Sequence, residues 1–196
     1  MISQKIKFSN SKTAAVFSAV WAGIEISLSP ILSTVKFPLR GFVLSLFAVV
    51  ILVAAGKFVN KKGSLLSIGI ACATLKFALT GHFSIAAVFA VILQGLIAEL
   101  IIIPGRTSKI RAVLTGTVIL SYTYIHGLLL QTLYFGKSIF DVYGKFLSFI
   151  TGSDDENLLI YLLYFLSVVY FICGAFAGYA GFNLSEKIKK QLQINE

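Results

Sequence analysis

The sequence predicts an all-α, polytopic membrane protein with six transmembrane helices and both termini cytoplasmic. The first observation is composition: mean hydropathy is +0.89 and 57% of the residues are hydrophobic, against roughly 45–50% apolar residues in a soluble domain. The second is the 21-residue stretch 83–103, FSIAAVFAVILQGLIAELIII, because a helix of that length crosses a hydrocarbon core of roughly 30 Å. The third is the distribution of basic residues. With 196 residues, we expect a single transmembrane domain, 1–196.

Each predicted span is an apolar run that ends near a charged residue, a proline or a glycine. Pro38 precedes the second span and Lys57 follows it, while Pro104 and Gly105 end the fourth. The polar tail after the last span is expected to form a short helix on the cytoplasmic surface. The expected spans are residues 13–33, 40–56, 64–80, 83–103, 112–135 and 158–182.

The segment 137–150 is too short and too amphipathic to be a span. Phe140, Tyr143, Leu147 and Ile150 recur at helical spacing, so one face of such a helix would be apolar. We expect an interfacial helix, or a loop folded over the protein, between the fifth and sixth spans.

Basic residues fix the predicted orientation. Of the 17 Lys and Arg residues, 12 fall in the N-terminal segment, in 57–62, in 106–111 and in the tail, whereas the two alternate loops, 34–40 and 137–157, hold four. Six spans place the richer segments on one face, and the positive-inside rule makes that face cytoplasmic. The formal charge of +9 is therefore read as a topology signal, and no nucleic-acid partner is expected.

Several classes of site have no counterpart in the sequence. Cys72 and Cys173 lie inside apolar runs without CxxC spacing, which favours reduced thiols packed as small hydrophobic groups. The two histidines, His82 and His126, are far apart with no local cluster of ligands, so no metal site is expected. We see no Ser-His-Asp arrangement, no phosphate-binding glycine loop and no zincin motif. Neither a cofactor nor an enzymatic activity is predicted.

Polar residues inside the predicted spans converge on one depth. With the orientation above, those in the outer halves of the spans, or at their outer ends, could line a ligand pocket between helices, with aromatic walls and a few hydrogen-bonding groups. The alternative is structural: Glu25 and Lys76 neutralise one another, and the tyrosines form an interfacial belt. The candidate substrate-binding residues are Glu25, Lys76, His82, Tyr122, Tyr124, His126, Gln131, Tyr161 and Tyr164.

Two further features lie in the predicted inner half. On the central helix, Gln94 is expected to bond a neighbouring helix, and Glu99 to pair with Arg106 or Arg111. On the first span, small residues recur every four positions, which lets another helix approach closely. This stripe is either a docking face or packing within the bundle; it consists of Ala15, Ala19 and Gly23.

These residues resemble the substrate-binding (S) components of energy-coupling-factor (ECF) vitamin transporters. The resemblance rests on size, six spans with both termini inside, the Ala15-x-x-x-Ala19 pair and a long outer loop before the sixth span. The heptad 94–100, QGLIAEL, with Gln94, Gly95 and Glu99, is similar to the QG-x-x-AEL run of the thiamine-precursor (hydroxymethylpyrimidine) type. A full ligand signature of the thiamine, biotin or riboflavin types is absent.

The resemblance implies a non-enzymatic binding subunit in the plasma (inner) membrane of a prokaryotic cell. It would capture a vitamin or vitamin precursor outside and dock through its first helix on a membrane coupling protein that carries two cytoplasmic ATPases. A second class of function stays open, a membrane scaffold or assembly protein whose polar residues hold helices together. An intramembrane enzyme is a weaker third possibility, because no convergent nucleophile–base or multi-carboxylate set is visible.

Overall fold

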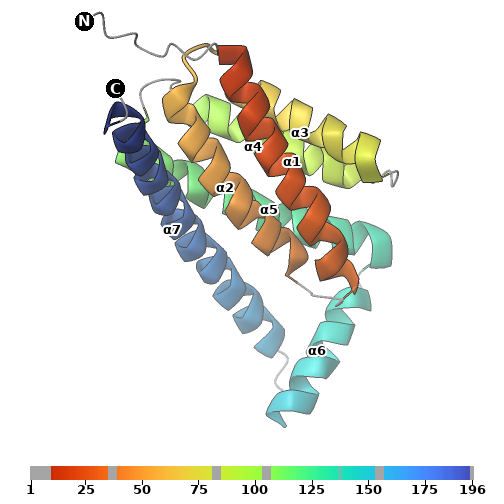
Figure 1. The fold of residues 1–196 in the computed structure, drawn as a ribbon. Helices are drawn as coiled ribbons and strands as arrows, with labels where there is room; N and C mark the ends of the chain where they lie inside the picture. Colours follow the sequence, from red (N-terminus) through yellow and green to blue (C-terminus); the bar gives the residue numbers. More distant parts are fainter. Residues whose placement is uncertain are drawn as a thin grey trace, which may run out of the picture.

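In a computed structural model, the described residues 10–34, 39–80, 85–102, 107–136, 138–152 and 157–194 form an α-helical bundle (Figure 1). Among the described helices, four are long and apolar enough to cross a membrane, and two shorter apolar helices accompany them. This arrangement confirms the all-α class and a membrane protein with several apolar helices. The helices are α1 (Asn10–Thr34), α2 (Arg40–Phe58), α3 (Ser64–Thr80), α4 (Ile85–Ile101), α5 (Lys109–Phe135), α6 (Ser138–Thr151) and α7 (Leu158–Ile194).

The predicted boundaries differ at two elements. In the expected central span, 83–103, the described helix is α4, which ends at Ile101, whereas residues 83, 84 and 103 lie outside the described residues. The tail is helical, as expected, but it continues α7 without a break to Ile194. Residues 183–194, NLSEKIKKQLQI, contain neither Pro nor Gly to end the helix and include strong helix formers.

One end of the bundle collects the basic residues. There the start of α1 meets the end of α2 (Asn10 Oδ1 accepts from Asn60 N–H at 2.9 Å), and Lys57 at the end of α2 pairs with Glu186 of α7. Lys109 at the start of α5 lies over the Tyr179 ring of α7. We call this the basic end; its described Lys and Arg residues are Lys12, Lys57, Lys61, Lys62, Lys109, Arg111, Lys187, Lys189 and Lys190.

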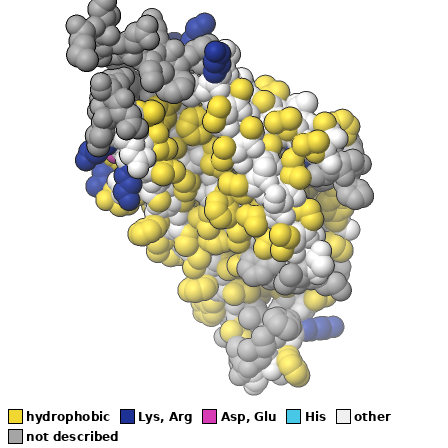
Figure 2. All heavy atoms as spheres, viewed as in Figure 1, with side chains coloured by type: hydrophobic (Ala, Val, Ile, Leu, Met, Phe, Trp, Pro, Cys, Tyr) yellow, Lys and Arg dark blue, Asp and Glu magenta, His cyan; other side chains and the backbone are white. Residues whose placement is uncertain are grey.

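Helix α1 begins at the basic end and α7 ends there (Figure 1). Figure 2 shows most of the visible Lys and Arg side chains at one end, while hydrophobic side chains cover the body of the bundle. Large exposed apolar residues on α5 and α7, such as Leu129, Phe165 and Phe176, are what a lipid-facing surface requires.

Helix α2 is the most buried of the four long helices and contacts α1, α3, α4, α5 and α7. Its core residues include Ala48, Val49, Leu52 and Val53, all at most 1% exposed. In lipid, helices associate through close packing and hydrogen bonds rather than through a hydrophobic force. The position of the central helix α2 therefore depends on close packing against its neighbours.

Glycines set the closest crossing, between α5 and α7. A Cβ on Gly116 would overlap the carbonyl oxygen of Gly174, and one on Gly178 would overlap that of Ala112. A second crossing joins α3 and α4, where a Cβ on Gly95 would lie 3.1 Å from the Leu65 carbonyl oxygen and from the Gly69 Cα. Gly95 of the heptad thus has a packing reason to be glycine.

Candidate functional site

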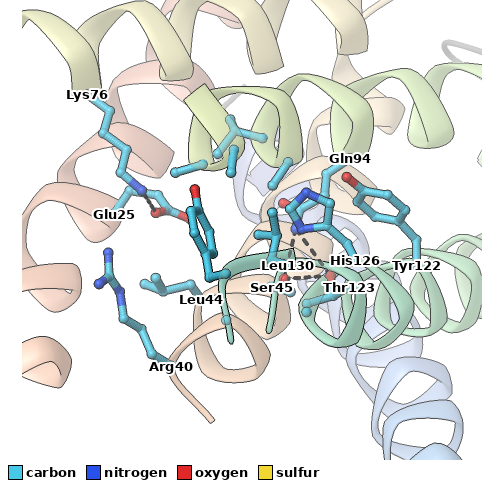
Figure 3. A pocket seen from close by; sticks show the side chains of 17 residues that line it. Glu25, Arg40, Leu44, Ser45, Lys76, Gln94, Tyr122, Thr123, His126 and Leu130 are labelled. Atoms are coloured by element: carbon cyan, nitrogen blue, oxygen red, sulfur yellow. Dashed lines mark hydrogen bonds and ion pairs between the residues drawn. The ribbon is translucent and has the colours of Figure 1, made fainter. Parts of the chain in front are cut away.

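A cavity of about 300 Å³ opens between five helices, in the half of the bundle away from the basic end. It is walled by the second half of α1, the start of α2, the end of α3, the first half of α4 and the second half of α5. Figure 3 shows it from close by. The lining residues are Glu25, Arg40, Gly41, Leu44, Ser45, Lys76, Ala86, Ala87, Ala90, Val91, Gln94, Tyr122, Thr123, His126, Gly127, Leu130 and Tyr134.

A buried ion pair forms one side of the cavity. Lys76 Nζ donates to Glu25 Oε2 at 2.6 Å, and the two side chains are only 13% and 5% exposed. This pairing agrees with the structural alternative that the sequence left open, in which each charge lowers the cost of holding the other away from water. Arg40 lies on the same side of the view (Figure 3), and its guanidinium donates to the hydroxyls of Ser29 and Ser33 on α1.

Neutral polar groups form the other side. Gln94 Nε2 donates to Ser45 Oγ at 2.8 Å, and Ser45 Oγ lies 2.9 Å from Thr123 Oγ1. Thr123 in turn donates to the Ile119 carbonyl at 2.9 Å. The Tyr122 and His126 rings lie 5.4 Å apart, beside Gln94 in the view (Figure 3). The expected bond from Gln94 to a neighbouring helix is therefore present.

Helical phase decides which residues of α5 reach the cavity. Tyr122, His126, Leu130 and Tyr134 are spaced by four residues, so they share one face, and all four line the cavity. Tyr124 stands about 200° around the helix from Tyr122. Its hydroxyl donates to the Leu163 carbonyl of α7.

Three other predicted binding residues lie outside the cavity. Gln131 accepts from the Tyr143 hydroxyl of α6 at 3.1 Å. Tyr161 and Tyr164 are 62% and 71% exposed on α7, a helix that contributes nothing to the cavity wall. The prediction used only the position of these residues along each span, which carries no information about which way each side chain faces. His82 lies outside the described residues.

Sequence reasoning missed several wall residues. Arg40 was counted only as a loop charge, and Ser45, Thr123 and Tyr134 were not singled out. Gln94 was placed in the inner half, away from the pocket, yet it lies near the middle of α4 and the cavity extends to that depth. A polar side chain within a predicted span is the signal that could have identified Ser45 and Thr123.

Glu99 has a structural role, with partners other than those expected. Its two carboxylate oxygens accept from the backbone N–H groups of Gly63 and Leu65, at 2.6 and 2.8 Å. These donors stand at the start of α3, where a helix has unsatisfied N–H groups and a positive dipole end. Glu99 therefore caps α3 from α4 rather than pairing with Arg111; Arg106 lies outside the described residues.

The small residues of α1 face outward. Ala15, Ala19 and Gly23 are exposed, and a Cβ on Gly23 would meet nothing within 4 Å. Among the described residues the stripe therefore has no packing partner in this chain, which removes the support for internal packing.

Comparisons with known proteins leave the family open: no family model, no curated protein and no solved structure matches this chain. Within the described residues, no three His, Cys, Asp or Glu side chains are grouped so as to hold a metal ion.

Proposed function

We propose that this protein is the substrate-binding S component of an ECF-type importer, which captures a vitamin-like molecule outside the cell. The observation that carries the proposal is the cavity between α1, α2, α3, α4 and α5. Its volume of about 300 Å³ is at the lower end of the range for small-molecule sites, and its wall combines apolar and aromatic side chains with hydrogen-bonding and charged groups that could orient a ligand.

The charge distribution supports a direction of capture. The basic end would face the cytoplasm by the positive-inside rule, and the cavity lies in the opposite half of the bundle. Helices α1 to α5 and α7 would be the six spans, with α3 and α4 shorter than the rest. The amphipathic α6 would lie at the outer interface, where Tyr143 joins it to Gln131 of α5.

The exposed stripe on α1 supports a partner. Ala15, Ala19 and Gly23 offer a surface without large side chains, which a helix of a membrane coupling protein could approach closely. The coupling protein would carry two ATPases on the cytoplasmic side.

A scaffold protein is the second candidate, favoured by one observation. The Glu25–Lys76 pair joins α1 to α3, and the Gln94–Ser45–Thr123 bonds join α4, α2 and α5, so five helices are linked without any ligand. A scaffold protein would need only such polar contacts between its helices.

The two candidates differ in what the purified protein retains. An S component purified from its own host should carry a small molecule that native mass spectrometry detects, and cells should accumulate the labelled molecule. A scaffold carries none. Protein that releases no small molecule and binds none of those tested would refute the importer.

Docking is tested on α1 with one matched control. Ala15→Trp and Ala19→Trp should hold a partner helix away and lose contacts along the crossing. Uptake should fail, while binding by the isolated protein persists. Ala78→Trp, which replaces an exposed alanine on α3, should leave uptake unchanged. Loss of binding and uptake together would contradict a docking role.

A further inference from the structure

The charges on the cavity wall do not balance. Glu25 contributes one negative charge, whereas Lys76 and Arg40 contribute two positive charges, and among the described residues no other Asp, Glu, Lys or Arg lines the cavity. With His126 neutral, the described wall carries one net positive charge. A cavity lined by a net charge of one sign attracts a ligand of the opposite sign, so a bound anion would be favoured.

Arg40 is the cation of the wall that could bind an anionic ligand. Glu25 holds its ion pair with Lys76, while the partners of Arg40 are the neutral hydroxyls of Ser29 and Ser33. In the described part of the chain, no carboxylate oxygen lies within 4.0 Å of the Arg40 guanidinium. Those two hydroxyls hold the guanidinium at the wall, and its remaining N–H groups form a fork that suits a carboxylate or a phosphate.

The hydrogen-bond chain on the other side fixes which way Gln94 points. The Ile119 carbonyl can only accept, so the Thr123 hydroxyl donates to it, Ser45 donates to Thr123, and Gln94 donates to Ser45. This order requires the Gln94 NH₂ group to face Ser45. The amide oxygen is left over as an acceptor.

That acceptor has no partner in the described structure. Gln94 is 5% exposed, and both its Oε1 and the Tyr122 hydroxyl are buried without a hydrogen bond. A buried amide oxygen without a donor costs free energy until something donates to it. A bound molecule with an N–H or O–H group would satisfy it.

From these two features we infer that the cavity binds a small, water-soluble anion of one net negative charge. Its oxyanion, a carboxylate in the simplest case, lies against Arg40, and an N–H or O–H group at its other end donates to Gln94 Oε1. The inference rests on the proposed function only in taking this cavity as the ligand site; it adds the chemical class of the substrate. The phosphate of an anionic lipid has the same chemistry at Arg40, so the experiment must separate the two sources.

The test measures the charge of what binds. Molecules released from the protein purified from its own host are identified by mass spectrometry, and we expect a water-soluble monoanion. In parallel, thermal unfolding is followed with 4-aminobenzoate and with 4-aminobenzamide, which differ mainly in charge and both carry an amine donor. The acid should raise the melting temperature more than the amide does.

Substitutions test whether Arg40 is the residue that binds the anion. Arg40→Gln keeps hydrogen-bonding capacity toward α1 but removes the charge, so affinity for the released anion should fall about 10- to 100-fold. Arg40→Lys should recover part of it, and Gln94→Leu should weaken binding by removing the acceptor. Arg111→Gln removes the same charge at the basic end and should change affinity less than twofold.

Each outcome decides the inference. A neutral or cationic released molecule, an amide that stabilises as well as the acid, or a lipid as the sole retained anion would overturn it and leave the importer standing. A bound monoanion whose uptake needs no ATPase would support the inference and overturn the importer. Absence of both a released molecule and any probe-induced shift would refute the two together.

Discussion

At the residue scale, the Glu25–Lys76 pair is the most consequential contact. Both side chains are largely buried, so removing one partner takes away the opposite charge that offsets the burial of the other, which costs about 3–5 kcal/mol. We expect Glu25→Leu and Lys76→Met each to lower the unfolding free energy by that amount. The double variant should recover most of the loss, as measured by thermal unfolding in detergent.

A second Lys–Glu pair provides the control. Lys57 and Glu186 join α2 to α7, and the Glu186 side chain is 37% exposed. Because exposed pairs contribute about 0–1 kcal/mol, Glu186→Leu should change stability little. Equal losses at Glu25 and Glu186, or a double variant no better than the singles, would contradict the buried-pair argument.

At the element scale, the α5–α7 crossing depends on glycines. Gly116→Ala would place a methyl group on the backbone of Gly174, and neither helix can yield without opening the crossing. The expected loss is about 1–3 kcal/mol or more, seen as a lower melting temperature or a failure to fold.

Helix α5 contains its own control. Gly127 belongs to the same helix, and a Cβ there would meet nothing within 4 Å. Gly127→Ala should therefore gain helix propensity, up to about 1 kcal/mol. Both substitutions replace Gly by Ala, but one is expected to lower the stability of the protein and the other to raise it. A stabilising Gly116→Ala would show that the helices do not approach so closely.

At the scale of the whole molecule, the testable quantity is orientation. A cysteine placed at the exposed Lys145 of α6 should react with an impermeant reagent added from outside, and one placed at the exposed Ser108 should not. The background is a variant in which Cys72 and Cys173 are replaced. The reverse labelling pattern would invert the molecule and place the cavity on the cytoplasmic side.

Much of the fold could be predicted because the signals for each helix are local in the sequence. Apolar runs such as 40–56 and 64–80 mark helices, since a backbone in lipid must satisfy its own hydrogen bonds. The clusters Lys57–Lys62 and Lys187–Lys190 likewise indicated that several helix ends lie together, and the structure places them at one end. The extension of α7 was missed only because a polar helix gives no hydropathy signal.

The sequence by itself determined the all-helical class and most of the helices, because hydropathy, charge and helical rise all act along one dimension. Only the tertiary structure decided that Glu25, Lys76 and His126 share a cavity with Arg40 and Gln94. It also decided that Tyr124 forms a hydrogen bond with α7, and Gln131 one with α6. That choice depends on the rotation of each helix about its own axis. That rotation goes with contacts between helices distant in sequence, such as Gly116 with Gly174 and Gly69 with Gly95. The position of a residue along its helix does not reveal these contacts.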